Sequence, residues 1–142
     1  DESVAGWDWF GLQLANRTEL MIYLLRREQG GYHPASSGTF VTASGEARHL
    51  RLEDFRVQVL DTWKSRKSGA VYPCRWRIRI DPLGLDLRVA SNVPDQELHA
   101  QAPRLVYWEG SVAISGNAEG DGTDGVGYVE MTGYARPFGL LR

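Results

Sequence analysis

The sequence of 142 residues contains a single cysteine, Cys74. One cysteine excludes an internal disulfide and any zinc site built from several cysteines. We expect Cys74 to be a small buried side chain, because a nucleophilic thiol needs a neighbouring base and positively charged surroundings. The chain also lacks a run of about eighteen apolar residues, so we predict no transmembrane segment.

Charge of one sign does not dominate the sequence either. The formal net charge is −2 at pH 7 and the isoelectric point is near 5.9, which gives no electrostatic reason to expect nucleic acid or an anionic membrane as a partner. The basic cluster of Arg75, Arg77 and Arg79 alternates along one run. Because residues two apart share a strand face, we interpret this cluster as a solvated face.

The familiar catalytic and metal-binding motifs are missing as well. The sequence has no phosphate-binding loop and no HExxH, GxSxG, CxxC or EF-hand pattern. His33, His49 and His99 are widely spaced in or near predicted loops, and we interpret them as solvated side chains rather than metal ligands. The residues alone therefore identify no catalytic group, and they predict no metal site and no cofactor.

The sequence does contain a series of short apolar runs bounded by Gly, Pro, Asp and Asn turns. Predicted strands cover residues 7–14, 19–27, 39–42, 47–52, 55–61, 72–81, 85–90, 107–116 and 126–134. Residues 19–27 are apolar almost throughout and also allow a helix. No helical crossover long enough for a parallel sheet is present. We therefore predict one all-β domain over residues 1–142, an antiparallel barrel of about eight to ten strands.

Alternation within these runs also predicts which side chains form the core. Phe55, Val57 and Val59 share one face of their run, and the apolar residues of the run over 72–81 lie opposite its arginines. The residues that we expect to be buried are Trp76, Ile78, Leu85, Leu87, Val112 and Ile114.

Asp8 lies between two tryptophans. In a strand Trp7 and Trp9 share one face, while Asp8 and Phe10 share the other. Large aromatic side chains are costly to leave in water, so one of these two sets needs cover from outside the barrel. We expect that cover from a preceding domain, with Asp8 on the rim of any ligand site.

Two glutamates also stand beside aromatic residues. Glu109 follows Trp108 and shares a strand face with Tyr107, and Glu130 shares a face with Tyr128. A carboxylate that faces an apolar interior has a raised pKa and can serve as an acid or as a ligand contact. The alternative is that these glutamates face water or pair with arginines across strands.

Several segments, in order along nearly the whole chain, resemble the C-terminal lipocalin-like domain of the carotenoid 1,2-hydratase (hydroxyneurosporene synthase) and AttH family, which includes proteins called predicted secreted hydrolases. They are "GWDWFGLQL", "TELMIYLLRR", "ASGEARHL", "DTWKSRKSGAVYPCRWRI", "LGLDLRV", "DQEL", "YWEGSVAISG" and "GVGYVEMTGYA". The resemblance implies two consecutive lipocalin-like β-barrels, of which this domain is the second. It also implies an apolar ligand and a secreted or periplasmic location.

The sequence departs from the family pattern at two places. The family's histidine–aromatic segment would lie upstream of "GWDWF", where this chain has "DESVA", and an acidic residue is expected near the second strand, where "MIYLLRR" offers Tyr23. The resemblance therefore implies the fold and the ligand class rather than the hydratase reaction. The candidate ligand-binding residues are Asp8, Tyr23, Tyr107, Glu109, Tyr128 and Glu130.

Two functions from different classes are consistent with this sequence. The first is a lipocalin-like module that binds an apolar, isoprenoid- or lipid-like molecule, or that completes a site with an upstream lipocalin-like domain. The alternative is part of a lyase, such as a carotenoid hydratase-like enzyme, or of a hydrolase whose active site is shared with the upstream domain. Ligand sites are common at barrel mouths and domain interfaces, which suits both hypotheses.

Overall fold

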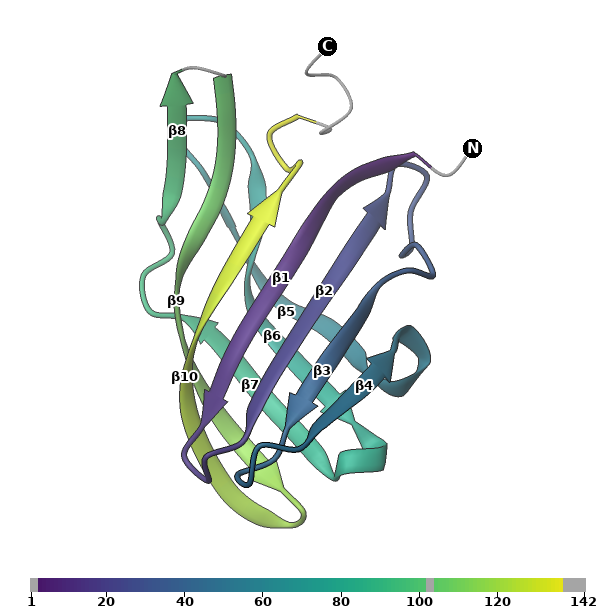
Figure 1. Ribbon diagram of the computed structural model, residues 1–142. Helices are drawn as coiled ribbons and strands as arrows, with labels where there is room; N and C mark the ends of the chain where they lie inside the picture. Colours follow the sequence, from purple (N-terminus) through teal and green to yellow (C-terminus); the bar gives the residue numbers. More distant parts are fainter. Residues whose placement is uncertain (1–2, 102–103, 137–142) are drawn as a thin grey trace.

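The computed structural model describes residues 3–101 and 104–136, which form ten antiparallel strands and two short 3-10 helices (Figure 1). The strands are β1 (Val4–Leu14), β2 (Glu19–Arg27), β3 (Ser37–Val41), β4 (Ala47–Arg51), β5 (Arg56–Lys64), β6 (Val71–Ile80), β7 (Leu85–Ser91), β8 (Glu97–Gln101), β9 (Arg104–Ala118) and β10 (Asp121–Thr132). The helices are η1 (Leu52–Asp54) and η2 (Asp81–Leu83). The predicted all-β antiparallel fold is confirmed, and residues 19–27 form a strand rather than a helix. Among the described residues, no helix has both the length and the apolar character needed to cross a membrane.

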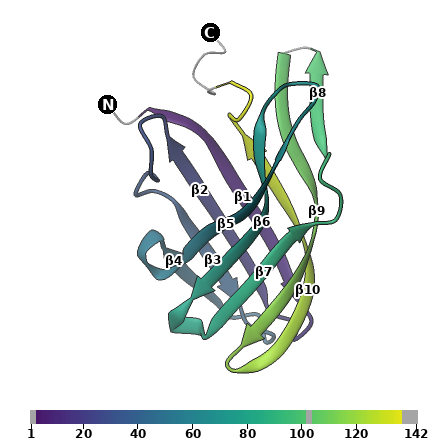
Figure 2. The ribbon, with the colours of Figure 1, turned by 180° about the vertical axis from the view of Figure 1, so that it is seen from behind.

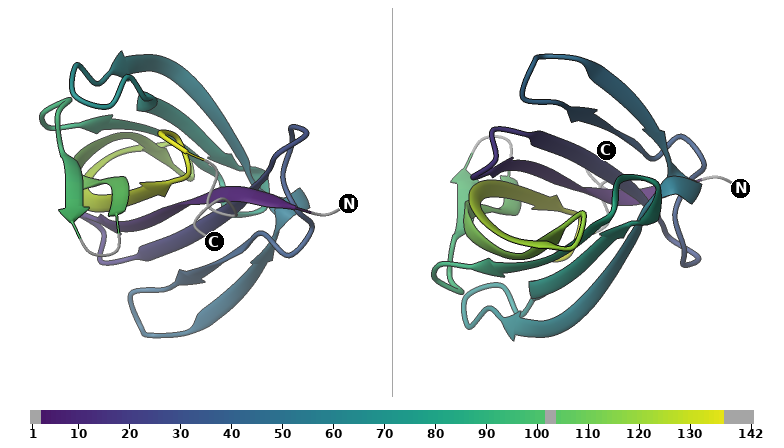
Figure 3. Two further views of the ribbon diagram at one scale, coloured as in Figure 1. Left: turned by 90° about the horizontal axis from the view of Figure 1, so that it is seen from above. Right: turned by 90° about the horizontal axis from the view of Figure 1, so that it is seen from below.

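All ten strands belong to one sheet that curls around the apolar core (Figures 2 and 3). The strand order is β4-β3-β2-β1-β10-β9-β7-β6-β5, and β8 pairs with β9 outside this path. The strands β4 and β5 are the two ends of the path, and no ladder joins them within the described part of the chain. The sheet is therefore a curled half-barrel, and η1 connects its two free edges.

The hairpin of β9 and β10 is longer than the sequence predicts. Glu119 and Gly120 have φ angles of 52° and 86°, which is the left-handed geometry of a two-residue hairpin turn. Pairing therefore begins at once, with Asp121 opposite Ala118. Most of the residues between the predicted strands 107–116 and 126–134 therefore belong to β9 and β10, and strand β8 lies between the predicted strands 85–90 and 107–116.

The core lies on the concave face of the curled sheet. Trp76 is 1% exposed, and its ring meets that of Phe10 edge to face, with 5.4 Å between the centroids. The predicted burial of Trp76, Ile78, Leu85, Leu87, Val112 and Ile114 is confirmed. Side chains therefore fill the barrel at this level, and the grooves described below lie on its outer surface.

The predicted shared face of Phe55, Val57 and Val59 holds, since Val59 is paired with Trp76. Val59 is nevertheless 45% exposed, because β5 is a free edge of the sheet with no strand beside it in the described chain. The expectation for Cys74 is wrong, because Cys74 is half-buried rather than buried. Burial raises the pKa of its thiol, which keeps the sulfur protonated and weakly nucleophilic.

Candidate functional site

Three of the candidate residues form one row across the outer face of the sheet. Trp9 on β1 is paired with Tyr23 on one side and with Glu130 on the other. Glu130 is in turn paired with Glu109 on β9. Residues paired across antiparallel strands bring their side chains within reach of each other. The register thus places Tyr23, Trp9, Glu130 and Glu109 side by side in one row, although the sequence separates them widely.

The neighbouring rows continue this surface. Tyr128 is paired with Gly11, next to the Trp9 row, and is 44% exposed. Tyr107 lies on the other side of that row, paired with Thr132. We call the outer surface of β2, β1, β10 and β9 the aromatic face and define it by Trp7, Trp9, Tyr23, Tyr107 and Tyr128. It contains five of the six candidate ligand-binding residues, namely Tyr23, Tyr107, Glu109, Tyr128 and Glu130.

A groove of about 600 Å³ runs along the aromatic face, and Trp9, Met21, Val126 and Tyr128 are among its lining residues. Gly11 shapes its floor, because a Cβ atom at this position would lie only 2.5 Å from Cη2 of Trp9. The absence of a side chain at Gly11 allows the indole ring to lie flat along the sheet. Val126 is 63% exposed, so the groove presents apolar surface to the outside.

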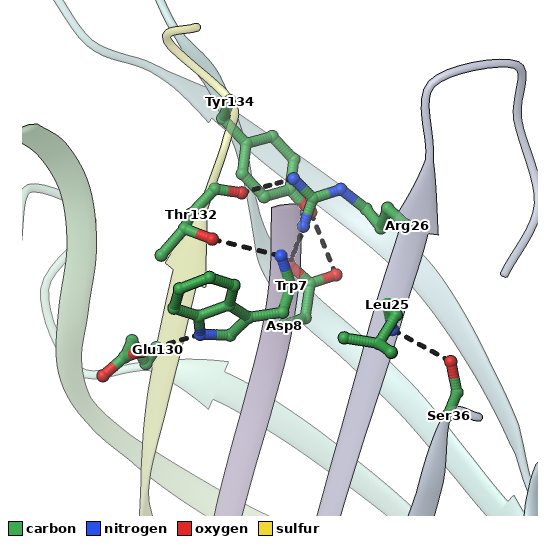
Figure 4. A network of polar contacts seen from close by, with 8 residues as sticks. All are labelled: Trp7, Asp8, Leu25, Arg26, Ser36, Glu130, Thr132 and Tyr134. Atoms are coloured by element: carbon green, nitrogen blue, oxygen red, sulfur yellow. Dashed lines mark hydrogen bonds and ion pairs between the residues drawn. The ribbon is translucent and has the colours of Figure 1, made fainter. Parts of the chain in front are cut away.

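Hydrogen bonds fix the upper end of the aromatic face (Figure 4). The indole Nε1 of Trp7 donates to Oε1 of Glu130 at 2.8 Å, and the backbone N–H of Trp7 donates to Oγ1 of Thr132 at 3.1 Å. Glu130 is also directly opposite Glu109. Like charges directly opposite each other are unfavourable in a sheet, and the indole N–H of Trp7 provides Glu130 with a hydrogen-bond donor.

Asp8 is the sixth candidate, and its side chain points to the inside of the barrel. Its Oδ1 atom lies 2.5 Å from Nη1 of Arg26, and the hydroxyl of Tyr134 donates to Oδ1 at 2.9 Å (Figure 4). Arg26 also donates to the carbonyl of Thr132, and its guanidinium lies 3.8 Å from the Tyr134 ring centre. Three strands thus contribute to one buried polar cluster at the end of the barrel where β1 begins.

The electrostatics of this cluster favour a protonated Asp8 at mildly acidic pH. Asp8 is 4% exposed. Burial raises the pKa of its carboxyl to about 6, and the opposing effects of Arg26 and of the Tyr134 hydrogen bond do not cancel that shift. Burial, followed by the Asp8 charge, also raises the pKa of the Tyr134 phenol. The cluster therefore contains a carboxyl that titrates close to neutral pH.

The structure decides between the two interpretations of Glu109. Trp108 is 1% exposed in the interior, where its Nε1 donates to the carbonyl of Pro94 at 2.8 Å. Glu109 and Tyr107 are half-buried on the opposite, outer face. An interior position for Glu109 is therefore wrong, because the curl of the sheet directs Trp108 inwards. Whether these outer residues bind a ligand stays a prediction.

A second polar cluster was missed at the sequence level. Glu97 on β8 has a side chain only 2% exposed. It accepts hydrogen bonds from the hydroxyls of Ser65 and Ser68 at 2.7 and 2.6 Å, and it lies 2.6 Å from Nε2 of His99. Burial alone would raise the pKa of Glu97, but the hydrogen bonds from Ser68 and Ser65 hold it below its usual value. The interpretation of His99 as a solvated loop residue is wrong.

The sequence predicted neither the Asp8 cluster nor the Glu97 cluster, because both depend on contacts between distant segments. Arg26 lies near the end of β2 and Tyr134 just after β10, and no local pattern links either residue to Asp8. Only the pairing of β1 with β2 and β10 brings them together. Glu97 and His99 lie in a strand that the sequence did not predict. Among the described residues, no group of three or more His, Cys, Asp or Glu side chains could hold a metal ion.

Comparisons with known proteins agree with this architecture. A family model described as AttH-like matches residues 1–134. A crystal structure of a protein assigned as AttH from Nitrosomonas europaea matches with a TM-score of 0.82 and 31% identity, over 96% of this chain and 41% of that chain. The crystal structure of kievitone hydratase from Nectria haematococca matches with a TM-score of 0.74 and 23% identity, over 94% of this chain and 40% of that chain. No curated protein matches the sequence significantly.

These matches have two consequences. The lipocalin-like fold that the resemblance implied is confirmed, and the likeness to kievitone hydratase shows the fold alone. The chain spans about two fifths of the length of both solved structures.

Proposed function

The chain belongs to the AttH-like family, and from this premise we propose that it binds an apolar, isoprenoid- or lipid-like small molecule on its aromatic face. A preceding lipocalin-like domain would supply the other wall of the site. The observation that carries the proposal is the apolar groove lined by Trp9, Met21, Val126 and Tyr128. Its volume of about 600 Å³ falls within the range of roughly 300–1,000 Å³ that is usual for small-molecule sites.

The chemistry of the groove suits an elongated apolar ligand. Trp9 and Tyr128 offer flat aromatic surfaces, and Met21 is an adaptable apolar side chain that fits irregular shapes. A few polar side chains, among them Gln13 and Glu19, also line the groove, and Glu130 and Glu109 lie in the Trp9 row beside it. A ligand with a long hydrocarbon body and one polar end would match this distribution.

The need for a second wall follows from the exposure of the groove. Val126 and Tyr128 are 63% and 44% exposed, and contiguous exposed apolar surface marks a binding or interaction site. More than half of each solved neighbour lies beyond the part that this chain matches. These observations support a preceding domain as the partner that covers the groove.

Retinol is a suitable probe, because its isoprenoid chain is apolar and quenches tryptophan fluorescence by energy transfer. We expect saturable quenching of this chain, with weaker binding for Val126→Ser and Tyr128→Ser, because each variant removes apolar contact from the groove. Val71→Ser is the matched control, since Val71 is 48% exposed outside the groove. Equal affinities for V126S and V71S would contradict the proposal.

Asp8 favours a second candidate function, in which the domain contributes an acid–base group to a lyase or hydrolase. A carboxyl with a pKa of about 6 can donate and accept a proton near neutral pH, and Tyr134 holds it in place. In the native protein, Asp8→Asn should abolish hydration of an isoprenoid alkene while leaving retinol binding intact. Full activity in D8N would exclude this role for Asp8.

A further inference from the structure

The outer surface of β5, β6 and β7 lies on the side of the barrel away from β1 and β2 (Figure 3), and it is rich in arginine. The arginines alternate with core residues along the strands, so they share this outer face. They are Arg56, Arg75, Arg77, Arg79 and Arg88, and the acidic residues among them are Asp61 and Asp86. The expectation of a solvated face for the arginines of β6 agrees with this placement, but it does not explain the arrangement of charges.

The arginines differ in whether they have partners. Arg77 makes a bidentate ion pair with Asp86, with its Nε and Nη2 atoms 2.9 and 2.7 Å from the two carboxylate oxygens. Arg88 is directly opposite Arg77 on the neighbouring strand, an unfavourable pairing of like charges. Within the described part of the chain, no ion pair or hydrogen bond engages the side chain of Arg88 or that of Arg75. Two exposed guanidinium groups are thus left with their donors free.

A hollow of about 420 Å³ lies between these two arginines, with Leu60 and Ser115 also in its lining. Its floor is formed by Ala90 and Ala113, which are paired with each other. They belong to the row that begins with Asp61 and continues through Arg75, its partner across the strands. Their short side chains keep the floor low, while the arginines stand higher on either side. We call this hollow the arginine groove.

We propose that the arginine groove binds the carboxylate or phosphate group of a small anionic ligand. Guanidinium groups present paired N–H donors that match the oxygens of both anions, and the Ser115 hydroxyl adds a further donor. Leu60, which is 42% exposed, offers an apolar contact to the body of the ligand. The arginine groove adjoins the aromatic face, since Ala113 is paired with Val126, but its proposed ligand does not depend on the function proposed for that face.

One carboxylate, that of Asp61, also lines the arginine groove and partly offsets its positive charge. Asp61 accepts a hydrogen bond from the backbone N–H of Thr62 at 2.8 Å, which directs one of its oxygens to its own strand. The lining of the arginine groove therefore has two positively charged side chains and one negatively charged side chain. The hydrogen bonds from Arg77 have the largest effect in holding the pKa of Asp86 below its usual value, and the charges of Arg79 and Arg88 lower it further.

Hexanoate and inorganic phosphate are suitable probes, with binding to this chain followed by amide chemical shifts. We expect Arg75→Gln and Arg88→Gln each to weaken binding by about tenfold, the loss of one charge-assisted hydrogen bond. Arg79→Gln is the matched control, because it removes the same charge from the same face outside the groove. Equal weakening by R79Q and R75Q would show diffuse attraction and overturn the proposal.

Ala113→Leu distinguishes a groove from a flat charged surface, since it fills the floor without changing the charge. We expect A113L to lose hexanoate and phosphate binding while its melting temperature stays unchanged, because Ala113 is exposed. Vesicles containing phosphatidylglycerol provide the second arm, in which the phosphate belongs to a lipid headgroup. Binding to vesicles that A113L retains, together with no binding of the free anions, would overturn the proposal in favour of a membrane surface.

Discussion

The hydroxyl of Tyr134 donates a hydrogen bond to Oδ1 of Asp8 over 2.9 Å, although 126 positions separate the two residues in the chain. The pairing of β1 with β10 makes this contact possible, since it brings the start of one strand to the end of the other. Arg26 completes the cluster from β2. A buried carboxyl is tolerable only with such partners, so the contact joins the first strand of the chain to the segment that follows the last one.

Tyr134→Phe tests the value of this hydrogen bond. We expect it to lower the free energy of unfolding by about 1–3 kcal/mol, the range for a buried charged acceptor that loses a donor. The pKa of Asp8 should rise further, because the lost bond stabilises the carboxylate form. Chemical denaturation and NMR titration measure the two effects. Tyr128→Phe is the control, because Tyr128 is 44% exposed, and a similar loss in both variants would contradict the assignment.

The raised pKa of Asp8 predicts that this residue stabilises the folded protein most at acidic pH. Its pKa is raised in the folded protein to about 6 from 3.8, so the folded state binds more protons than the unfolded state between these values. Asp8 therefore adds stability below about pH 4, and this contribution is lost as the pH rises through 6. A pKa shift of this size corresponds to a contribution of at most about 3 kcal/mol to the free energy of unfolding.

Comparison with Asp8→Asn isolates this effect from that of the other carboxyl groups. Glu97 and Asp86 have lowered pKa values, so their contributions are lost as the pH falls and act in the opposite direction. Between pH 4 and pH 6.5, urea denaturation should show that wild type loses stability relative to D8N. A difference between the two proteins that stays constant over this range would refute the raised pKa.

Glu97→Gln should loosen β8, because the buried carboxylate joins this strand to the turn between β5 and β6 through Ser65 and Ser68. An amide in its place keeps one acceptor oxygen and loses the charge, so we expect a loss of about 1–3 kcal/mol. Hydrogen exchange should accelerate at residues 97–101 before it changes in β1 or β10. Glu119→Gln is the control, since Glu119 is exposed in the β9–β10 turn. Unchanged exchange in β8 would show that the strand is held by its pairing with β9 alone.

Gly11→Ala tests the floor of the groove on the aromatic face. The added Cβ atom would lie 2.5 Å from the Trp9 ring, so the ring has to move away from the sheet. We expect a shift in tryptophan emission and weaker retinol binding, with a stability change of about 1 kcal/mol or less, because only a side chain is displaced. Gly122→Ala is the matched strand control, since its Cβ would meet nothing within 4 Å. Identical emission and binding in both variants would contradict the described position of Trp9.

All the strands except β8 and most of the core could be predicted from the sequence, because alternation is a local property. Trp76 and Ile78 lie two apart in a run with arginines between them, and no arrangement of that strand buries both kinds of side chain on one face. The same rule correctly separated Asp8 and Phe10 from the two tryptophans beside them. It grouped Tyr107 with Glu109 and Tyr128 with Glu130, and these groupings hold in the folded chain.

The direction of each face was decided by the tertiary structure alone. Alternation states that Trp108 and Glu109 point to opposite sides, but the curl of the whole sheet determines that Trp108 is the buried one. Strand register likewise placed Tyr23, Glu130 and Glu109 in one row with Trp9, and it brought Arg26 and Tyr134 to Asp8. A net charge of −2 averages over the chain, whereas folding gathered the arginines of β5, β6 and β7 on one outer face. The sequence by itself determined which side chains share a face of each strand. The pairing of strands that are distant in the chain decided whether that face points to the core or to the outside, because no local pattern encodes a contact between distant strands.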